Sequence, residues 1–317
     1  MTSDTYIENL KAKLLSLNET AWENRLNNRL IEEWLDNFTG ETGDVDKERM
    51  HAAYLLSQFM YFGSQQMREL ICSLYRDFFK YPIVESIRRG NNNTTDVTFI
   101  EVEYLQELQL TRFFGVGNPS ESGSHLLYFF RQENRLPTEL FLNTGQVFNR
   151  AGAQVELKHP NVKRYVFIDD ICGTGTQAKQ YSDELVKDIK ELNPDAEVIY
   201  LVLFGCSEGL TTVKNGLFTR VDAVIELDKT FKVFDQSSRH FEACDQLIDR
   251  NFALHMSAHY GVKLCPGSPL GYKNSQLLLG FHHNTPDNSL PIMWFDEMPQ
   301  SWLPVFRRYP KYYGGII

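Results

Sequence analysis

The sequence predicts an α/β protein with a central parallel sheet, on three observations. Apolar runs of strand length occur at residues 164–169, 198–204 and 223–227. Helical patterns separate them, over residues 177–192 and 207–216. Parallel strands that are buried on both faces read as unbroken apolar runs, and strand-helix-strand alternation joins such strands through right-handed crossovers. We therefore expect one parallel sheet in the central part of the chain.

The most informative stretch is residues 166–178, Val-Phe-Ile-Asp-Asp-Ile-Cys-Gly-Thr-Gly-Thr-Gln-Ala. Its apolar start predicts a buried strand, and Asp169 and Asp170 follow where that strand ends. Ligands of open α/β sheets bind outside the carboxyl ends of the strands. Two adjacent carboxylates at that place can accept hydrogen bonds from two vicinal hydroxyls, as a ribose offers.

The turn that follows is built from small residues, namely Gly173, Thr174, Gly175 and Thr176. Glycines let the backbone turn tightly and approach a ligand, and the threonines add hydroxyl donors. A helix that begins near Gln177 would direct free N–H groups at an anion. These residues predict a ribose-phosphate site. The alternative is an ordinary strand-turn-helix with an aspartate N-cap, which needs only one acid and one glycine.

A second loop of the same character comes earlier in the chain. Residues 112–117 are expected to form a strand, and the following loop to residue 124 concentrates turn residues and hydroxyls. Its candidate binding residues are Gly117, Ser120, Ser122 and Gly123. An apolar helical pattern begins at His125, so the loop can equally be a capped helix start with Ser122 or Ser124 as N-cap. Both interpretations can hold together.

Three regions are predicted along the chain. Residues 1–90 read as a helical N-terminal region, with apolar residues at helical spacing over 5–38 and 46–88. Residues 97–235 read as the α/β core, with further strands expected at 97–102 and 141–148. Residues 236–317 are expected to form a C-terminal helix, over 239–260, and a cap.

The cap contains an apolar run, the turn Asn-Thr-Pro-Asp-Asn and a second apolar run, which predict a hairpin-like hood over the sheet edge. Asn284, in that turn, is a candidate contact for the base or leaving group of a ligand. The adjacent His282 and His283 do not predict a metal site, because neighbouring side chains of a strand point to opposite sides.

Composition limits the class of function. No run approaches the roughly 20 apolar residues that span a membrane, and the N-terminus is polar and acidic, so we expect a soluble, unsecreted protein. The net charge of −9 gives no strong signal for direct nucleic-acid binding. Five scattered cysteines predict neither disulfides nor a zinc site and favour a reducing cytoplasm. Cys172 could be a reactive thiol if the helix terminus lowered its pKa.

Residues 166–178 resemble the ribose-5-phosphate motif of type I phosphoribosyltransferases, in which a strand, two acids and a Thr-Gly loop bind phosphoribosyl pyrophosphate. Two further stretches extend the resemblance: Phe-Gly-Val-Gly-Asn-Pro-Ser-Glu-Ser-Gly at 114–123 and His-Asn-Thr-Pro-Asp-Asn-Ser-Leu-Pro at 283–291. With the helical N-terminus, they make the chain similar to the phosphoribosyltransferase-like effector family of prokaryotic conflict systems.

The resemblance implies a type I phosphoribosyltransferase-like core and a role for each motif. Asp169 and Asp170 would hold the ribose hydroxyls, residues 173–176 the 5-phosphate, and residues 115–124 the pyrophosphate. Mg²⁺ would be carried mainly by the pyrophosphate of the substrate. The family also implies an antiphage role and a partner such as a reverse transcriptase complex. Two positions depart from the pattern: Gly173 stands where some members have an acid, and Gln177 where many have a hydroxyl.

Two functions are therefore expected. The first is an enzyme that transfers or cleaves at ribose C1 of phosphoribosyl pyrophosphate or a nucleotide. The second is a catalytically inactive module that senses a nucleotide and signals to a partner protein. Gly173 and the lack of lysine or arginine in residues 115–124 favour the second. Release of base or pyrophosphate would distinguish them.

Overall fold

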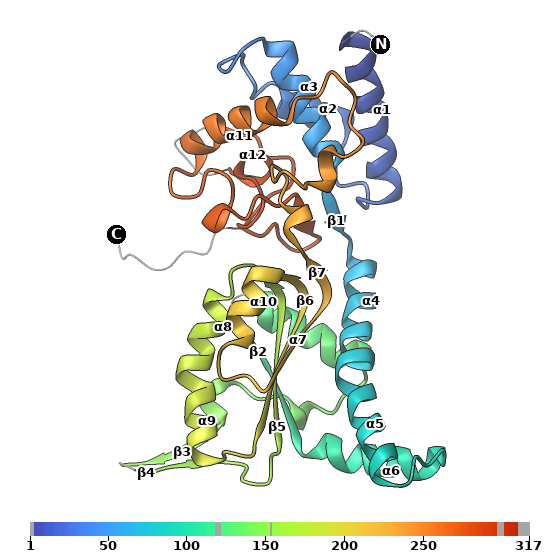
Figure 1. Cartoon of the computed structure of the whole chain (residues 1–317), viewed down its shortest axis with the longest axis vertical. Helices are drawn as coiled ribbons and strands as arrows, with labels where there is room; N and C mark the ends of the chain where they lie inside the picture. Colours follow the sequence, from blue (N-terminus) through green and yellow to red (C-terminus); the bar gives the residue numbers. More distant parts are fainter. Residues whose placement is uncertain (1–2, 118–121, 153, 297–300, 310–317) are drawn as a thin grey trace. The chain divides into compact units, whose positions relative to one another are not determined.

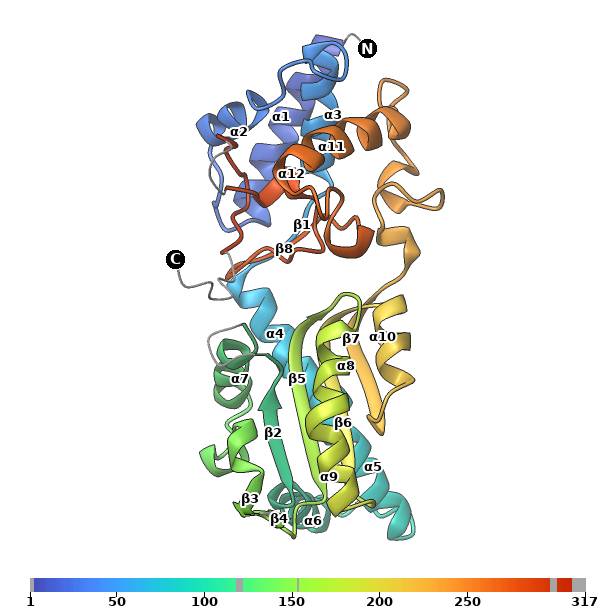
Figure 2. The ribbon, with the colours of Figure 1, turned by 90° about the vertical axis from the view of Figure 1, so that its left-hand side faces the viewer.

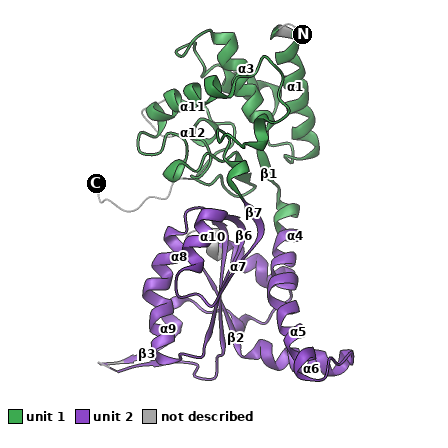
Figure 3. Cartoon of the chain, in the orientation of Figure 1, with its two compact units in different colours: residues 1–67, 228–317 green, residues 68–227 purple. Residues whose placement is uncertain are grey.

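The chain folds into two compact units (Figure 3). The computed structural model describes residues 3–117, 122–152, 154–296 and 301–309. Unit 1 combines the two ends of the chain, Met1–Met67 and Asp228–Ile317, and unit 2 is the middle, Arg68–Leu227. The predicted boundary at residue 90 therefore falls inside unit 2.

Unit 2 is built on a four-stranded parallel sheet, which confirms the predicted fold class (Figure 2). Its order is β2-β5-β6-β7. The strands are β2 (Thr111–Gly115), β5 (Arg164–Cys172), β6 (Glu197–Cys206) and β7 (Arg220–Leu227). Apart from Thr111, Asp169 and Asp170, their buried residues are apolar on both faces, as is typical of central parallel strands.

The side of the sheet on which the chain adds its next segment changes between β2 and β5. After β2 the chain forms α7 (Ser122–Glu133) and returns at Phe141, which makes an isolated parallel bridge to Phe113 on the outer side of β2. From β5 onward, each new strand is added on the opposite side. The carboxyl ends of β2 and β5 thus flank a topological switch point, where α/β sheets of this kind bind ligands.

Helices cover both faces of the sheet (Figure 2). One face packs on α8 (Thr176–Tyr181), a π-helical turn (Ser182–Val186) and α9 (Lys187–Leu192). The other packs on α7 and on the π-helical turn (Arg76–Lys80) that follows α4 (Ser64–Tyr75). Phe113 and Phe114 show the division: Phe113 contacts Phe79 and Phe130, whereas Phe114 stacks on Phe167.

The remaining elements of unit 2 include two corrections. The strand predicted at 97–102 is wrong, because these residues begin α6 (Val97–Gln109), which follows α5 (Tyr81–Gly90). The strand predicted at 141–148 is also wrong: 3₁₀ turns occupy Thr138–Leu140 and Thr144–Gln146. A short antiparallel pair, β3 (Phe148–Ala151) with β4 (Gln154–Leu157), comes after them.

The N-cap of α6 explains why residues 97–102 form a helix and not the predicted strand. Asp96 accepts a hydrogen bond from the Phe99 N–H at 3.1 Å, which starts a helix despite the β-branched residues that follow. Val97 and Val102 lie largely exposed on this helix. Their apolar side chains therefore indicate neither a strand nor a buried helix face.

Unit 1 is mainly helical (Figure 1). From the N-terminal segment come α1 (Ser3–Thr20), α2 (Asn28–Leu35), α3 (Val45–Ser57) and β1 (Met60–Phe62), and from the C-terminal segment α11 (Arg250–Leu264), β8 (Leu279–Phe281) and α12 (Pro291–Trp294). The helix predicted at 239–260 starts only at Arg250, where Asp249 caps it through the N–H groups of Asn251 and Phe252. The predicted hairpin is wrong, because β8 pairs in parallel with β1.

One apolar core joins the two segments of unit 1. The Trp34 indole N–H donates to the Ile292 carbonyl at 2.9 Å. Phe306 stacks on Phe59 with ring centres 4.4 Å apart and meets Trp22 edge to face. Neither segment buries its apolar side chains alone, so both ends of the chain are needed for this unit. Among the described residues, no helix is long and apolar enough to cross a membrane.

The first prediction concerns this shared core. Phe306→Ala removes a buried ring that contacts both segments, and we expect a loss of about 3–5 kcal/mol in unfolding free energy. Denaturant unfolding followed by tryptophan fluorescence measures it, since all four tryptophans of the chain lie in unit 1. Tyr309→Ala, at an exposed side chain nearby, is the control. A loss below about 1 kcal/mol, the usual range of surface changes, would contradict the shared core.

Candidate functional site

The acid pair lies on β5, at the switch point of the sheet. Asp169 pairs with Val202 of β6, and the strand continues to Cys172, so the acids sit just inside the strand rather than after it. Each is only 6% exposed. The candidate site therefore contains two largely buried carboxyl groups at the edge of the sheet.

Asp169 is held by a hydrogen bond from the neighbouring strand. Its Oδ2 accepts from the Tyr200 hydroxyl at 2.9 Å, and its Oδ1 accepts from the Asp170 N–H at 2.9 Å. Asp170 in turn accepts from the Ile171 N–H at 2.8 Å. Local N–H donors and one buried tyrosine therefore fix the orientation of both carboxyl groups.

Burial makes the charge of Asp169 costly. Burial first, and then the charge of Asp170, hold the pKa of Asp169 well above its ordinary range, although the Tyr200 hydroxyl and the Asp170 N–H oppose the shift. Burial, and then the charge of Asp169, also raise the pKa of Tyr200, which therefore remains a neutral donor. Such a buried acid beside a second acid is typical of functional sites, where stability is lost for chemistry.

Cys172 does not have the environment of a reactive thiol. Its side chain is buried, and burial followed by the charge of Asp169 raises its pKa to about 12. The thiol is therefore protonated at neutral pH and is a poor nucleophile.

The turn after β5 is packed against the backbone of α10 (Ser207–Lys214). Gly175 has a φ of +73°, and a Cβ there would lie 2.7 Å from the Gly209 carbonyl oxygen. A Cβ on Gly209 would lie 2.3 Å from the Gly173 carbonyl oxygen. These glycines are therefore required for contact between two backbones. The Thr174 and Thr176 hydroxyls lie 2.9 Å apart on the exposed side of the turn.

The loop after β2 reaches the same edge. The Val116 N–H donates to the Ile168 carbonyl at 3.0 Å, directly before the acid pair. Gly117, with a φ of +102°, accepts a hydrogen bond from the Tyr181 hydroxyl of α8 at 2.6 Å. The two predicted loops are thus neighbours at the switch point. Ser120 lies outside the described residues, and Ser122 and Gly123 form the first turn of α7.

The segments of sequence that form this edge contain no lysine or arginine. No lysine or arginine occurs in residues 113–130 or 165–178. At the ends of β6 and β7, the Ser207 hydroxyl donates to Glu226 at 2.7 Å. Backbone N–H groups and hydroxyls are therefore the donors that the two loops can offer to an anion.

Three residues of the site, Tyr200, Gly209 and Tyr181, were not predicted from the sequence. Tyr200 has the only side-chain hydroxyl in the apolar run of β6, and this pattern could have indicated a buried hydrogen bond. Gly209 interrupts a helical pattern, which often marks a close backbone approach. Tyr181 gave no signal, because its contact with Gly117 depends on the crossover.

Asn284 belongs to unit 1. Its side-chain oxygen accepts from the N–H groups of Thr285 and Tyr309, both at 3.0 Å. These bonds hold the turn that links β8 to the C-terminal segment. The predicted role of this turn as a hood over the acid pair stays a prediction.

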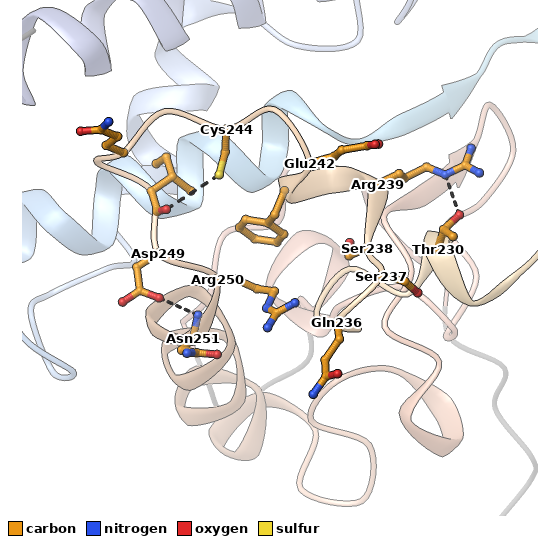
Figure 4. A pocket seen from close by; sticks show the side chains of 13 residues that line it. Thr230, Gln236, Ser237, Ser238, Arg239, Glu242, Cys244, Asp249, Arg250 and Asn251 are labelled. Carbon is orange, nitrogen blue, oxygen red and sulfur yellow. Dashed lines mark hydrogen bonds between the residues drawn. The ribbon is translucent and has the colours of Figure 1, made fainter.

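An open pocket of about 1130 Å³ in unit 1 contains none of the predicted residues (Figure 4). Three of its charged residues, Arg239, Asp249 and Arg250, have partners within the protein. Arg239 donates to the Thr230 hydroxyl at 2.9 Å, and Asp249 accepts from the Asn251 N–H at 2.8 Å. Arg250 donates to the Asp235 carbonyl at 3.0 Å. We therefore place the candidate site at the acid pair, where buried acids and interlocked loops coincide.

This combination of fold and motifs defines a phosphoribosyltransferase-like α/β protein. The family model PRTase-CE matches residues 31–308, so the chain belongs to the PRTase-CE family. No curated protein matches it. Among solved structures it is similar to the xanthine-guanine-hypoxanthine phosphoribosyltransferase of Helicobacter pylori, with 12% identity, 53% of this chain and 88% of that chain covered, and a TM-score of 0.27.

The second prediction tests the interlocked backbones. Gly175→Ala places a Cβ against the Gly209 carbonyl and forces a left-handed residue to carry a side chain, so we expect a loss of about 2–4 kcal/mol in unfolding free energy. Urea unfolding followed by far-UV circular dichroism measures it. Gly90→Ala, where a Cβ meets nothing within 4 Å, is the matched control in unit 2. Equal stability of both variants would show that the turn is not held by α10.

The third prediction concerns the buried acid. Because the pKa of Asp169 is raised on folding, stability is greatest with the carboxyl protonated and falls as pH rises through the raised pKa. Asp169→Asn removes this loss. Without ligand at neutral pH, we expect the variant to melt a few degrees higher, the effect of about 1 kcal/mol.

Calorimetry over a pH series provides the check. The advantage of Asp169→Asn should shrink as the pH falls toward about 4, the pKa of an unperturbed aspartate, and vanish below it, where the carboxyl is protonated in the folded and the unfolded state alike. Glu184→Gln, at an exposed carboxyl of the same unit, is the control. A variant that is less stable than the native protein at neutral pH would make Asp169 a structural residue.

Proposed function

We propose that the chain binds a ribose 5-phosphate ligand, either phosphoribosyl pyrophosphate or a nucleotide, and transfers or cleaves at ribose C1. One observation carries the proposal: two enclosed carboxyl groups lie at the switch point of a parallel sheet, beside a glycine turn fixed by α10. Membership of the PRTase-CE family supports the same class of ligand.

The acid pair would hold the sugar. Asp169 keeps its orientation through Tyr200, and in this proposal each of the two carboxyl groups accepts a hydrogen bond from one ribose hydroxyl. Hydroxyl donors favour the ionised form of a carboxyl whose burial disfavours it. Ribose binding would therefore relieve part of the cost of burying Asp169.

The two loops would hold the phosphates. The turn Gly173–Thr176 offers N–H groups at the start of the helical segment and the hydroxyls of Thr174 and Thr176. The loop that begins at Gly117 lies beside it and would take the pyrophosphate or the second end of a nucleotide. Anchoring at both ends fixes the reacting carbon between them.

The chemistry at C1 requires few groups from the protein. Bond breaking there develops positive charge on the ribose ring and negative charge on the leaving group. Asp169 and Asp170 would stabilise the ring by fixed negative charge, and the loops would hold the leaving phosphates in place. The protonated and buried Cys172 takes no part.

Mg²⁺ is the metal that this chemistry would use, because it neutralises a pyrophosphate leaving group. Within the described residues, no group of three or more His, Cys, Asp or Glu side chains could hold a metal. The ion would be held mainly by pyrophosphate oxygens and water, which is a common mode for Mg²⁺.

The biological role that we propose is that of an antiphage effector in the cytoplasm. It rests on the motif resemblance to conflict-system effectors and not on any contact in the structure. A partner such as a reverse transcriptase complex would then restrain or trigger the site.

A second candidate is a nucleotide sensor without turnover, favoured by Gly173 at the position where some related enzymes carry an acid. The two candidates are separated by incubating the protein with Mg²⁺ and a panel of nucleotides and phosphoribosyl pyrophosphate. Release of base or pyrophosphate supports the enzyme. Binding without any release supports the sensor, and no binding contradicts both.

The fourth prediction tests the ribose contact. Asp169→Asn with Asp170→Asn removes both charges at nearly constant volume, so we expect at least a tenfold loss of affinity for phosphoribosyl pyrophosphate, about the effect of one charged hydrogen bond. Isothermal titration calorimetry measures it, and circular dichroism confirms folding. Asp183→Asn is the control in the same unit. Unchanged affinity in the double variant would disprove the ribose site.

A further inference from the structure

A smaller pocket in unit 1 gathers polar residues from four parts of the chain. It has a volume of about 300 Å³. Arg25 follows α1, Tyr61 lies on β1, His283 and Asn284 follow β8, and Arg307 belongs to the C-terminal segment. This volume is at the lower end of small-molecule sites, which run from about 300 to 1,000 Å³.

The lining is positive although the protein is negative. Arg25, Arg307 and two histidines line the pocket, and none of its described lining residues is Asp or Glu. The chain as a whole has a charge of −9. In the pocket of Figure 4, by contrast, Glu242 and Asp249 stand among the arginines. The smaller pocket therefore favours an anion.

The two arginines are held differently. Arg25 donates from Nη2 to the His282 carbonyl at 3.0 Å, and its charge is near enough to the Glu23 carboxylate to help lower the pKa of Glu23. Arg307 lies 3.9 Å from Asp296, at the edge of ion-pair range, with both side chains partly exposed. Exposed pairs of this kind contribute little energy, so Arg307 can turn to a ligand at small cost.

Two hydrogen-bond donors of the lining also lack acceptors. Tyr61 is 6% exposed, and no described residue offers its buried hydroxyl a partner at good geometry, although Arg25 and Glu23 are near enough to influence its pKa. The Asn284 oxygen is used by two backbone N–H groups, so its NH₂ group is the part left to donate. A buried hydroxyl without a partner is unfavourable, and an acceptor on a ligand would satisfy it.

We propose that unit 1 carries a second binding site, for a phosphorylated small molecule of mononucleotide size. Arg25 and Arg307 bind its phosphate, and Tyr61 and Asn284 donate hydrogen bonds to the remainder. Apolar residues close the floor, since Phe306 is stacked between Phe59 and Tyr61. A dinucleotide exceeds the volume. This site uses neither the acid pair nor its loops and is independent of the function proposed above.

Calorimetric titration of the full chain with AMP and with inorganic phosphate tests the proposal. Arg307→Gln should weaken both probes at least tenfold, about the effect of losing one charged hydrogen bond. Arg29→Gln should change neither, because Arg29 lies outside the pocket, is 85% exposed and pairs with Glu33. In chains whose acid pair is disabled by Asp169→Asn with Asp170→Asn, equal binding with and without Arg307→Gln overturns the site, as does a native protein that binds neither probe.

Tyr61→Phe gives a readout that a purely structural role would not produce. It deletes an unsatisfied hydroxyl, so the melting temperature without ligand should stay equal or rise, whereas AMP affinity should fall several-fold. A lower melting temperature with unchanged AMP affinity contradicts the proposal.

The double variant Asp169→Asn with Asp170→Asn separates the two sites. It should keep the AMP binding that Arg307→Gln removes. If the double variant loses all AMP binding, the pocket of unit 1 is no independent site and the proposal fails, while the ribose site at the acid pair is supported.

Discussion

The hydrogen bond between Tyr200 and Asp169 is the contact around which unit 2 is arranged. It joins two central strands and holds a carboxyl group directly after three wholly buried apolar residues of β5, Val166, Phe167 and Ile168. Removing a carboxylate from water is expensive unless it is paired and hydrogen-bonded. Two donors and a partly open strand end make this burial tolerable, and the apolar strand below supplies the rigidity that holds the group in one orientation.

The rest of the site is made largely of backbone. The chain continues on one side of β2 first and on the other side, with β5, afterwards. This switch brings together two loops that are about 50 residues apart in sequence, as parallel topology commonly does. Gly175 and the Gly173 carbonyl then meet Gly209, and no side chain could replace Gly175 or Gly209 without a shift of the facing backbone. Side-chain variation at Thr174 or Thr176 is therefore compatible with the fold, whereas a Cβ at Gly175 is not.

The sequence predicted what depends on local pattern. Strands β5, β6 and β7 and the turn at Gly173–Thr176 were found because apolar runs and glycine spacing are local signals. The pairing of β1 with β8 was missed, because three-residue strands from opposite ends of the chain carry no periodicity. The helix at Val97 was misread because an aspartate cap outweighed β-branched residues. Packing of the chain ends into one unit is a long-range property that no window of sequence contains.

The two units present opposite electrostatic conditions to a phosphorylated ligand. The acid pair of unit 2 lies in chain segments without lysine or arginine, so a phosphate approaching it gains from a counter-ion such as Mg²⁺. The pocket of unit 1 has arginines and no carboxylate in its described lining, so it gains most from the bare anion. Free and Mg²⁺-bound forms of one ligand are in equilibrium, and each proposed site selects a different form.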